Sequence, residues 1–292
     1  MSAWQGKSRG NKFGYQLFVW ILKTFGVLPS YFILRIVAFY FFLFSTKANK
    51  NTFYLYRHRL GYGWLKSITK IYTNAFLLGQ SIIDKVVLMS DIKNNFTFNF
   101  DGEANLREIV ALQKGGILLS AHIGTWDIAG HLLKRLNTVI NIVIFDGEQA
   151  QIKNYMDKIT GKKSIKIIVI KNDLSHIYAI SDAFKNNELL CMHADRFLEG
   201  NKTISTKFLG KEAKFPIGPF VLASTFKVPV SYVFAVKENK LHYHLFASKI
   251  KNYDGQIKDI VIKNMLTDYA AEMEIKVKKY PAQWFNYFNF WA

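Results

Sequence analysis

The sequence predicts an α/β protein in which a mixed central sheet is flanked by helices. After residue 90, short apolar or β-branched runs alternate with helical or polar stretches, a pattern typical of strands covered by helices. Half of the 292 residues are apolar, enough to bury a large core, and 16% are aromatic, which suits a protein that meets lipid. The single cysteine, Cys191, excludes a disulfide framework and a multi-cysteine metal site, and it indicates a reducing compartment.

The N-terminal region is basic and strongly apolar. Residues 1–83 contain eleven Lys or Arg and no acidic residue, so most of the formal net charge of +18 comes from this segment. Lys23 and Arg35 interrupt the apolar stretch 15–45, so no uncharged run reaches the roughly 18 to 20 residues of a clean bilayer span. We expect two amphipathic, membrane-associated helices, broken near Gly26 and Pro29, with basic side chains reaching lipid phosphates.

Two alternatives stay open for this stretch. It can form a buried helical hairpin of a soluble domain, or a single spanning helix that carries Arg35 at a cost of about 2.5 kcal/mol or more. No Ala-x-Ala-like site follows the apolar run, so we do not expect a cleaved signal peptide.

The remaining elements follow in chain order. Residues 51–90 are expected to form further amphipathic helix, which makes 1–90 a helical membrane-facing region and 91–292 the α/β domain. The expected strands cover 116–121, 139–145, 165–170, 188–193, 228–236 and 241–248, and the last two form an antiparallel hairpin. A closing helix is expected at about 257–276, before an aromatic C-terminal segment.

The sharpest motif, SAHIGTWD at 120–127, directly follows the first of these strands. The carboxyl end of a strand is where open α/β sheets place their ligand clefts. Thr125 as a helix N-cap would put Asp127 in the first helical turn, near His122. A carboxylate on one imidazole nitrogen raises the basicity of the other, as a general base requires. The ordinary alternative is a core histidine and a helix-start carboxylate.

Four stretches carry a resemblance to a known family. The pattern His-x4-Asp, in the form AHIGTWDIAG, is similar to the signature of the lysophospholipid acyltransferase superfamily and resembles its bacterial lipid A late acyltransferase branch, the lauroyl and myristoyl transferases. MHADRFLEG, the run KFLGKEAKFPIGPFVLASTFKVPV at 207–230, and YPAQWF at 280–285 are similar to further stretches of that branch. The likeness covers about residues 4–291.

The resemblance implies a reaction and roles for residues. His122 would be the general base and Asp127 its orienting carboxylate, while a hydroxyl or amine of a lipid acceptor attacks the thioester of an acyl carrier protein or coenzyme A. No metal and no further cofactor is implied, and the place of action would be the cytoplasmic face of the bacterial inner membrane. Residues expected to bind substrate are Gly124, Trp126, Asp195, Arg196, Lys214 and Gly218. Members of this branch also acylate amino-acid lipids, glycolipids and aryl pigments, so the acceptor stays open.

The sequence lacks the motifs of several other protein classes. Gly-x-Ser-x-Gly and a P-loop are absent from the sequence, and so is any nucleic-acid-binding module, so we expect no nucleic-acid partner. His242 and His244 share one face of an expected strand, but without a third ligand they are better explained as surface residues than as a metal site. The alternative of a different class is a non-catalytic protein that binds an anionic membrane surface, in which His122 and Asp127 are structural.

Overall fold

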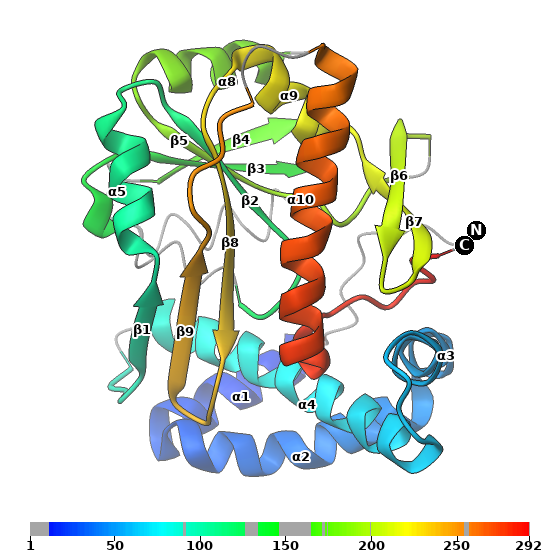
Figure 1. The fold of residues 1–292 in the computed structure, drawn as a ribbon. Coiled ribbons are helices and arrows are strands. Elements are labelled where there is room, and N and C mark those ends of the chain that lie inside the picture. Colours follow the sequence, from blue (N-terminus) through cyan, green and yellow to red (C-terminus); the bar gives the residue numbers. More distant parts are fainter. Residues whose placement is uncertain are drawn as a thin grey trace.

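The computed structural model describes residues 12–89, 92–125, 134–145, 165–170, 173, 175–198, 200–253 and 257–291. Within these residues a seven-stranded mixed sheet forms the centre of the molecule (Figure 1). In spatial order its strands are β1 (Thr97–Asp101), β9 (His242–Ala247), β8 (Val230–Lys237), β2 (Gly116–Ser120), β5 (Leu189–His193), β3 (Ile140–Phe145) and β4 (Ile165–Ile170). All neighbouring pairs are parallel except β8 and β9, which form the predicted antiparallel hairpin.

Both faces of the sheet are covered by helices. Ile117 and Leu119 of β2 pack into the core that α10 (Lys258–Lys279) covers, whereas Leu118 joins the core beside α5 (Glu103–Ala111). Because β2 is buried on both faces, its sequence is a continuous apolar run, as parallel central strands require. Among the described residues, the domain also contains α8 (Ser175–Lys185), α9 (Gly218–Phe226) and the short helices Lys134–Leu136 and Pro281–Gln283.

The predicted fold class is confirmed, but two strand features were not predicted. β1 pairs in parallel with β9 at the edge of the sheet, and a separate antiparallel hairpin consists of β6 (Thr203–Phe208) and β7 (Lys211–Pro216). β1 has only two apolar residues in TFNFD, and the hairpin carries several lysines, so neither shows the apolar run that marks the buried strands.

The N-terminal helices form a layer below the ends of β8 and β9 (Figure 1). They are α1 (Lys12–Phe25), α2 (Val27–Phe44), α3 (Thr46–Tyr54) with a π-helical turn at Leu55–Arg59, and α4 (Trp64–Met89). The predicted break near Gly26 is confirmed, since Gly26 has φ +84° between α1 and α2. The helix expected over 51–90 is interrupted, because the chain leaves the helical path between Arg59 and Trp64, where Gly61 has φ +70°.

Helix α2 has two different faces. Val27, Tyr31, Leu34 and Ala38 are buried, whereas the other face exposes apolar side chains to solvent. The exposed residues include Phe32, Ile36, Phe39, Tyr40, Leu43 and Phe44. The alternative of a fully buried helical hairpin is inconsistent with this exposed apolar face. With 18 residues and a mean hydropathy of 2.0, α2 is long and apolar enough to cross a membrane by length and composition.

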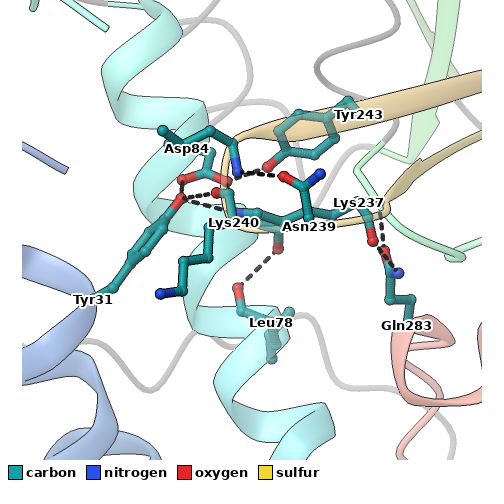
Figure 2. A network of polar contacts seen from close by, with 10 residues as sticks. Tyr31, Leu78, Asp84, Lys237, Asn239, Lys240, Tyr243 and Gln283 are labelled. Carbon is teal, nitrogen blue, oxygen red and sulfur yellow. Dashed lines mark hydrogen bonds and ion pairs between the residues drawn. The ribbon is translucent and has the colours of Figure 1, made fainter. Parts of the chain in front are cut away.

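A buried polar cluster joins the helical layer to the sheet (Figure 2). Asp84 of α4 pairs with Lys237 at the end of β8, and both carboxylate oxygens of Asp84 also accept tyrosine hydroxyls, from Tyr31 of α2 and Tyr243 of β9. Lys237 also donates to the Tyr31 hydroxyl. Burial raises the pKa of Asp84 and lowers that of Lys237, while the attraction between the two opposes both shifts. The cluster therefore satisfies two charges that would be costly to bury alone.

Candidate active site

His122 and Asp195 lie together at the carboxyl ends of two neighbouring parallel strands. Ser120 of β2 is in register with His193 of β5, and each strand is followed two residues later by one member of the pair. The Ala194 backbone N–H donates to the Ser120 carbonyl at 2.9 Å, which extends the ladder to the site. The pair therefore lies at the sheet edge where α/β proteins place their ligands.

Two hydrogen bonds connect His122 to Asp195. The His122 Nδ1 lies 2.7 Å from Oδ1 of Asp195, and the His122 backbone N–H donates to Oδ2 at 3.0 Å. About a fifth of the His122 side chain is exposed, whereas Asp195 is 1% exposed. A buried carboxylate thus holds an imidazole that solvent or substrate can reach.

The electrostatic surroundings keep Asp195 ionised. Burial by itself would raise the pKa of Asp195, but the charge and hydrogen bond of His122, with the nearby Arg196 and His193, hold it below its usual value. Since an ionised carboxylate only accepts hydrogen bonds, Nδ1 of His122 carries the hydrogen in this pair. Nε2 is then the nitrogen that can take up a proton from a reacting group.

A second histidine lies beside this pair. The His193 ring centroid is 4.3 Å from that of His122, and burial, together with the His122 and Arg196 charges, lowers the pKa of His193 well below its usual value. His122, His193 and Asp195 offer ligand atoms within 4.8 Å of one another, close enough to hold a metal ion. However, both Asp195 oxygens already accept N–H donors, so the arrangement fits a hydrogen-bonded acid–base pair better than a three-ligand metal site.

The C-terminal segment Pro281–Phe285 forms hydrogen bonds with the site residues. Gly124 N–H donates to the Gln283 carbonyl at 2.8 Å, and Phe285 N–H donates to the His122 carbonyl at 2.9 Å. The indole N–H of Trp284 donates to Oδ2 of Asp195 at 3.2 Å. His122 and Gly124 are therefore fixed by a segment more than 150 positions away in the sequence.

Gly124 is required by the geometry of this loop. Its φ is +70°, and a Cβ there would lie 1.9 Å from the Ala235 carbonyl oxygen. The Thr125 backbone N–H donates to the same oxygen at 2.8 Å. The backbone N–H groups of Gly124 and Thr125 are thus both engaged in hydrogen bonds within the protein. Gly124 acts here by letting the loop approach β8.

The structure brings together some of the predicted residues and leaves others apart. Arg196 lies beside the pair, where it donates to the Phe285 carbonyl and its charge lowers the pKa of Asp195. Lys214 is exposed on β7, opposite Ser205, and Gly218 is the exposed first residue of α9, so their substrate contacts stay predictions. Asp127, Trp126 and the helix expected after Thr125 lie outside the described residues.

Two residues have places that the sequence did not predict. Asp195, expected to bind substrate, is the hydrogen-bond partner of His122, and the approach of Trp284 to that carboxylate was not foreseen. His122 and Asp195 each stand two positions after the last residue of a strand, but the sequence pattern alone does not show that these two strands are neighbours. His244, whose side chain is 15% exposed, lies 3.0 Å from a carboxylate oxygen of Asp101 and 3.1 Å from one of Glu238.

Comparison with known proteins gives a family match over most of the sequence and likenesses of low similarity to solved structures. The 1-acyl-sn-glycerophosphate (LPA) acyltransferase PlsC from Thermotoga maritima shares 14% identity with this chain, covering 85% of this chain and 97% of its own, with a TM-score of 0.39. No curated protein matches the sequence. Residues 75–291 match the family described as bacterial lipid A biosynthesis acyltransferase, and this range includes His122, Asp195 and the C-terminal segment. Because the match covers more than half of the sequence, the chain belongs to that acyltransferase family.

Proposed function

We propose that this acyltransferase moves a fatty acyl chain from an acyl thioester to a hydroxyl or amine of a lipid acceptor, with His122 as general base. The observation that carries the proposal is the pair of His122 with the buried, ionised Asp195 at the carboxyl edge of the sheet. Such a pair fixes the tautomer of the imidazole and stabilises the imidazolium that forms during proton transfer.

The reaction needs no nucleophile from the protein. The acceptor oxygen attacks the thioester carbonyl carbon while Nε2 of His122 takes the proton from that oxygen. The tetrahedral intermediate then breaks its C–S bond, the thiolate leaves, and the proton held by His122 passes to the sulfur. Arg196, whose cationic group lies beside Asp195, is our candidate for holding an anionic part of the substrate. The role predicted for Asp127, that of orienting carboxylate, stays a prediction, because Asp127 lies outside the described residues and Asp195 is the carboxylate seen on Nδ1 of His122.

The acyl donor and the lipid acceptor that we propose are based on the net charge of the chain and on its family. An acidic acyl carrier protein, or coenzyme A with its phosphates, would be attracted to a chain of net charge +18. The acceptor we propose is a lipid A-type glycolipid, with amino-acid lipids, other glycolipids and aryl pigments as the alternatives. We place the reaction at the cytoplasmic face of the bacterial inner membrane, with the exposed apolar face of α2 and the basic residues of the N-terminal region in contact with anionic lipid.

The decisive experiment is acyl transfer with the purified full-length chain in vesicles. Labelled acyl groups are supplied on acyl carrier protein and, separately, on coenzyme A, together with total bacterial lipid, and the products are analysed by mass. We expect a new acylated lipid whose formation falls about 1,000-fold or more in His122→Gln, because the base is lost. His58→Gln, at an exposed histidine, serves as the matched control and should keep wild-type turnover.

The same assay tests the non-catalytic alternative. If neither donor labels any acceptor, or if His122→Gln transfers acyl groups at the wild-type rate, the proposed mechanism is wrong. The mass of the product identifies the acceptor, and the ratio of rates with the two donors identifies the preferred thioester.

A further inference from the structure

The aromatic C-terminal segment contacts the reacting pair directly. Trp284 forms an isolated antiparallel bridge with Ile123, so its side chain is fixed beside the backbone of His122. Asn74 of α4 donates to the carbonyls of Ala282 and Trp284, at 3.0 and 3.2 Å, and holds the segment from behind. Gln283 accepts from the backbone N–H of Lys237 and donates to its carbonyl. The segment is therefore held by α4 and β8 while it reaches the active site.

The indole N–H of Trp284 donates a hydrogen bond to Oδ2 of the buried Asp195 carboxylate. Its ring is 1% exposed and packs among Phe208, Phe290 and Trp291. Its N–H and the backbone N–H of His122 both donate to Oδ2, which leaves Oδ1 directed at Nδ1 of His122. A donor on Oδ2 also withdraws negative charge from the carboxylate and so moderates its attraction for a protonated imidazole.

We propose, building on the proposed function, that Trp284 is a positioning residue. Its indole N–H holds the Asp195 carboxylate in the orientation that fixes the tautomer of His122, and it sets the basicity of that histidine. Catalysis thus depends on a residue that touches neither substrate nor the reacting nitrogen, but acts through Asp195.

Several charged or titratable groups face His122 and must be kept constant in any test. From β5 and the residues after it come His193, Asp195 and Arg196. From α10 comes Tyr269, whose hydroxyl donates to the Ser120 carbonyl at 2.8 Å and whose phenol is fully buried. Trp284 belongs to none of these groups, so its replacement changes one hydrogen bond to Asp195 and leaves the neighbouring charges in place.

The test compares Trp284→Phe with Trp291→Phe. Both residues belong to the same aromatic cluster and both donate an indole N–H, but that of Trp291 goes to the Phe208 carbonyl at 3.0 Å. In Trp284→Phe we expect kcat at neutral pH to fall about three- to tenfold with little change in KM. The acidic limb of the pH profile of kcat should move up by about 0.5 to 1 pH unit. With one hydrogen-bond donor fewer, the Asp195 carboxylate attracts the His122 imidazolium more strongly. Trp291→Phe should keep the wild-type limb.

A substitution that preserves the ring shape guards against loss of folding. Benzothienylalanine at position 284 replaces the indole N–H by sulfur and should reproduce the shift of Trp284→Phe. The proposal is overturned if both position-284 variants keep the wild-type limb, or if Trp291→Phe moves the limb equally.

A second readout does not require activity. The pH titration of the His122 ring, followed by NMR through its 13Cε1 resonance and assigned with His122→Gln, should shift in the position-284 variants and not in Trp291→Phe. If the chain transfers no acyl groups, the proposed reaction fails, while this titration still decides whether Trp284 positions Asp195. An unshifted titration overturns the positioning role whether or not the chain is active.

Discussion

The chemistry of the site depends on the hydrogen bonds and charges around one carboxylate, that of Asp195. Asp195 is almost completely buried, yet it stays ionised because its two oxygens accept from His122 and Trp284 and because Arg196 is near. A carboxylate in such a place orients its partner without competing for the proton. In the proposed reaction, Asp195 therefore fixes the imidazole, and the partly exposed His122 exchanges a proton with substrate.

The partly buried His193 makes the stability of the protein dependent on pH. Burial lowers the pKa of His193 in the folded state well below its usual value, so the unfolded chain binds a proton that the native state does not. As the pH falls below about 6.5, this difference should remove about 1.4 kcal/mol of unfolding free energy per pH unit. His193→Gln should reduce that slope, measured by denaturant unfolding between pH 7 and 5, whereas His58→Gln at an exposed histidine should leave it unchanged. An identical slope in wild type and His193→Gln would contradict the assignment.

At the scale of elements, the Asp84 cluster fixes the helical layer to the sheet. Lys237→Met leaves the Asp84 carboxylate buried with only tyrosine hydroxyl donors from the cluster, and we expect it to cost about 3 to 5 kcal/mol of unfolding free energy. The double variant Asp84→Leu with Lys237→Met should recover most of this loss, because no charge then remains buried. Chemical denaturation in detergent measures both.

The control for this prediction is an ion pair at the surface. Lys278 pairs with Glu274 on α10 with 61% of its side chain exposed, so Lys278→Met should cost less than about 1 kcal/mol. Equal losses in Lys237→Met and Lys278→Met would show that the buried cluster contributes little to joining the layers.

The success of the sequence-based prediction differs between individual strands. The runs that became β2, β3, β4, β5 and β8 were recognised because strands of a covered sheet are continuously apolar. β1 and the β6–β7 hairpin were missed because partly exposed strands lack such a run. The approach of Asp195 to His122 depends on β2 and β5 being neighbours, which strand patterns alone do not fix. The contact with Trp284 depends on long-range packing of the C-terminal segment.

At the scale of the whole molecule, the exposed apolar face of α2 belongs to the same region as positive charge that no acidic residue offsets. The layer of α1, α2 and α4 lies at one end of the sheet (Figure 1), and the basic region 1–83 has no acidic residue to offset its charge. An apolar helix face next to basic side chains is the arrangement by which proteins lie on anionic membranes. The Asp84 cluster connects that layer to β8, and Gln283, bonded to the backbone of Lys237, continues the connection to the segment that holds Asp195.

Membrane attachment can be tested by charging the exposed face of α2. Phe32 and Ile36 are 71% and 68% exposed and lie one helical turn apart, so replacing both by Asp should leave the packing of α2 on α4 intact. Each side chain loses about 1.5 to 3 kcal/mol of burial in lipid, so flotation with anionic vesicles should show at least about a 100-fold weaker association. Tyr178→Asp, at a residue of α8 that is 76% exposed, is the matched control and should bind vesicles as the wild type does. Wild-type flotation of the α2 double variant would mean that this face does not contact lipid, and the circular dichroism spectrum of each variant establishes that the fold is retained.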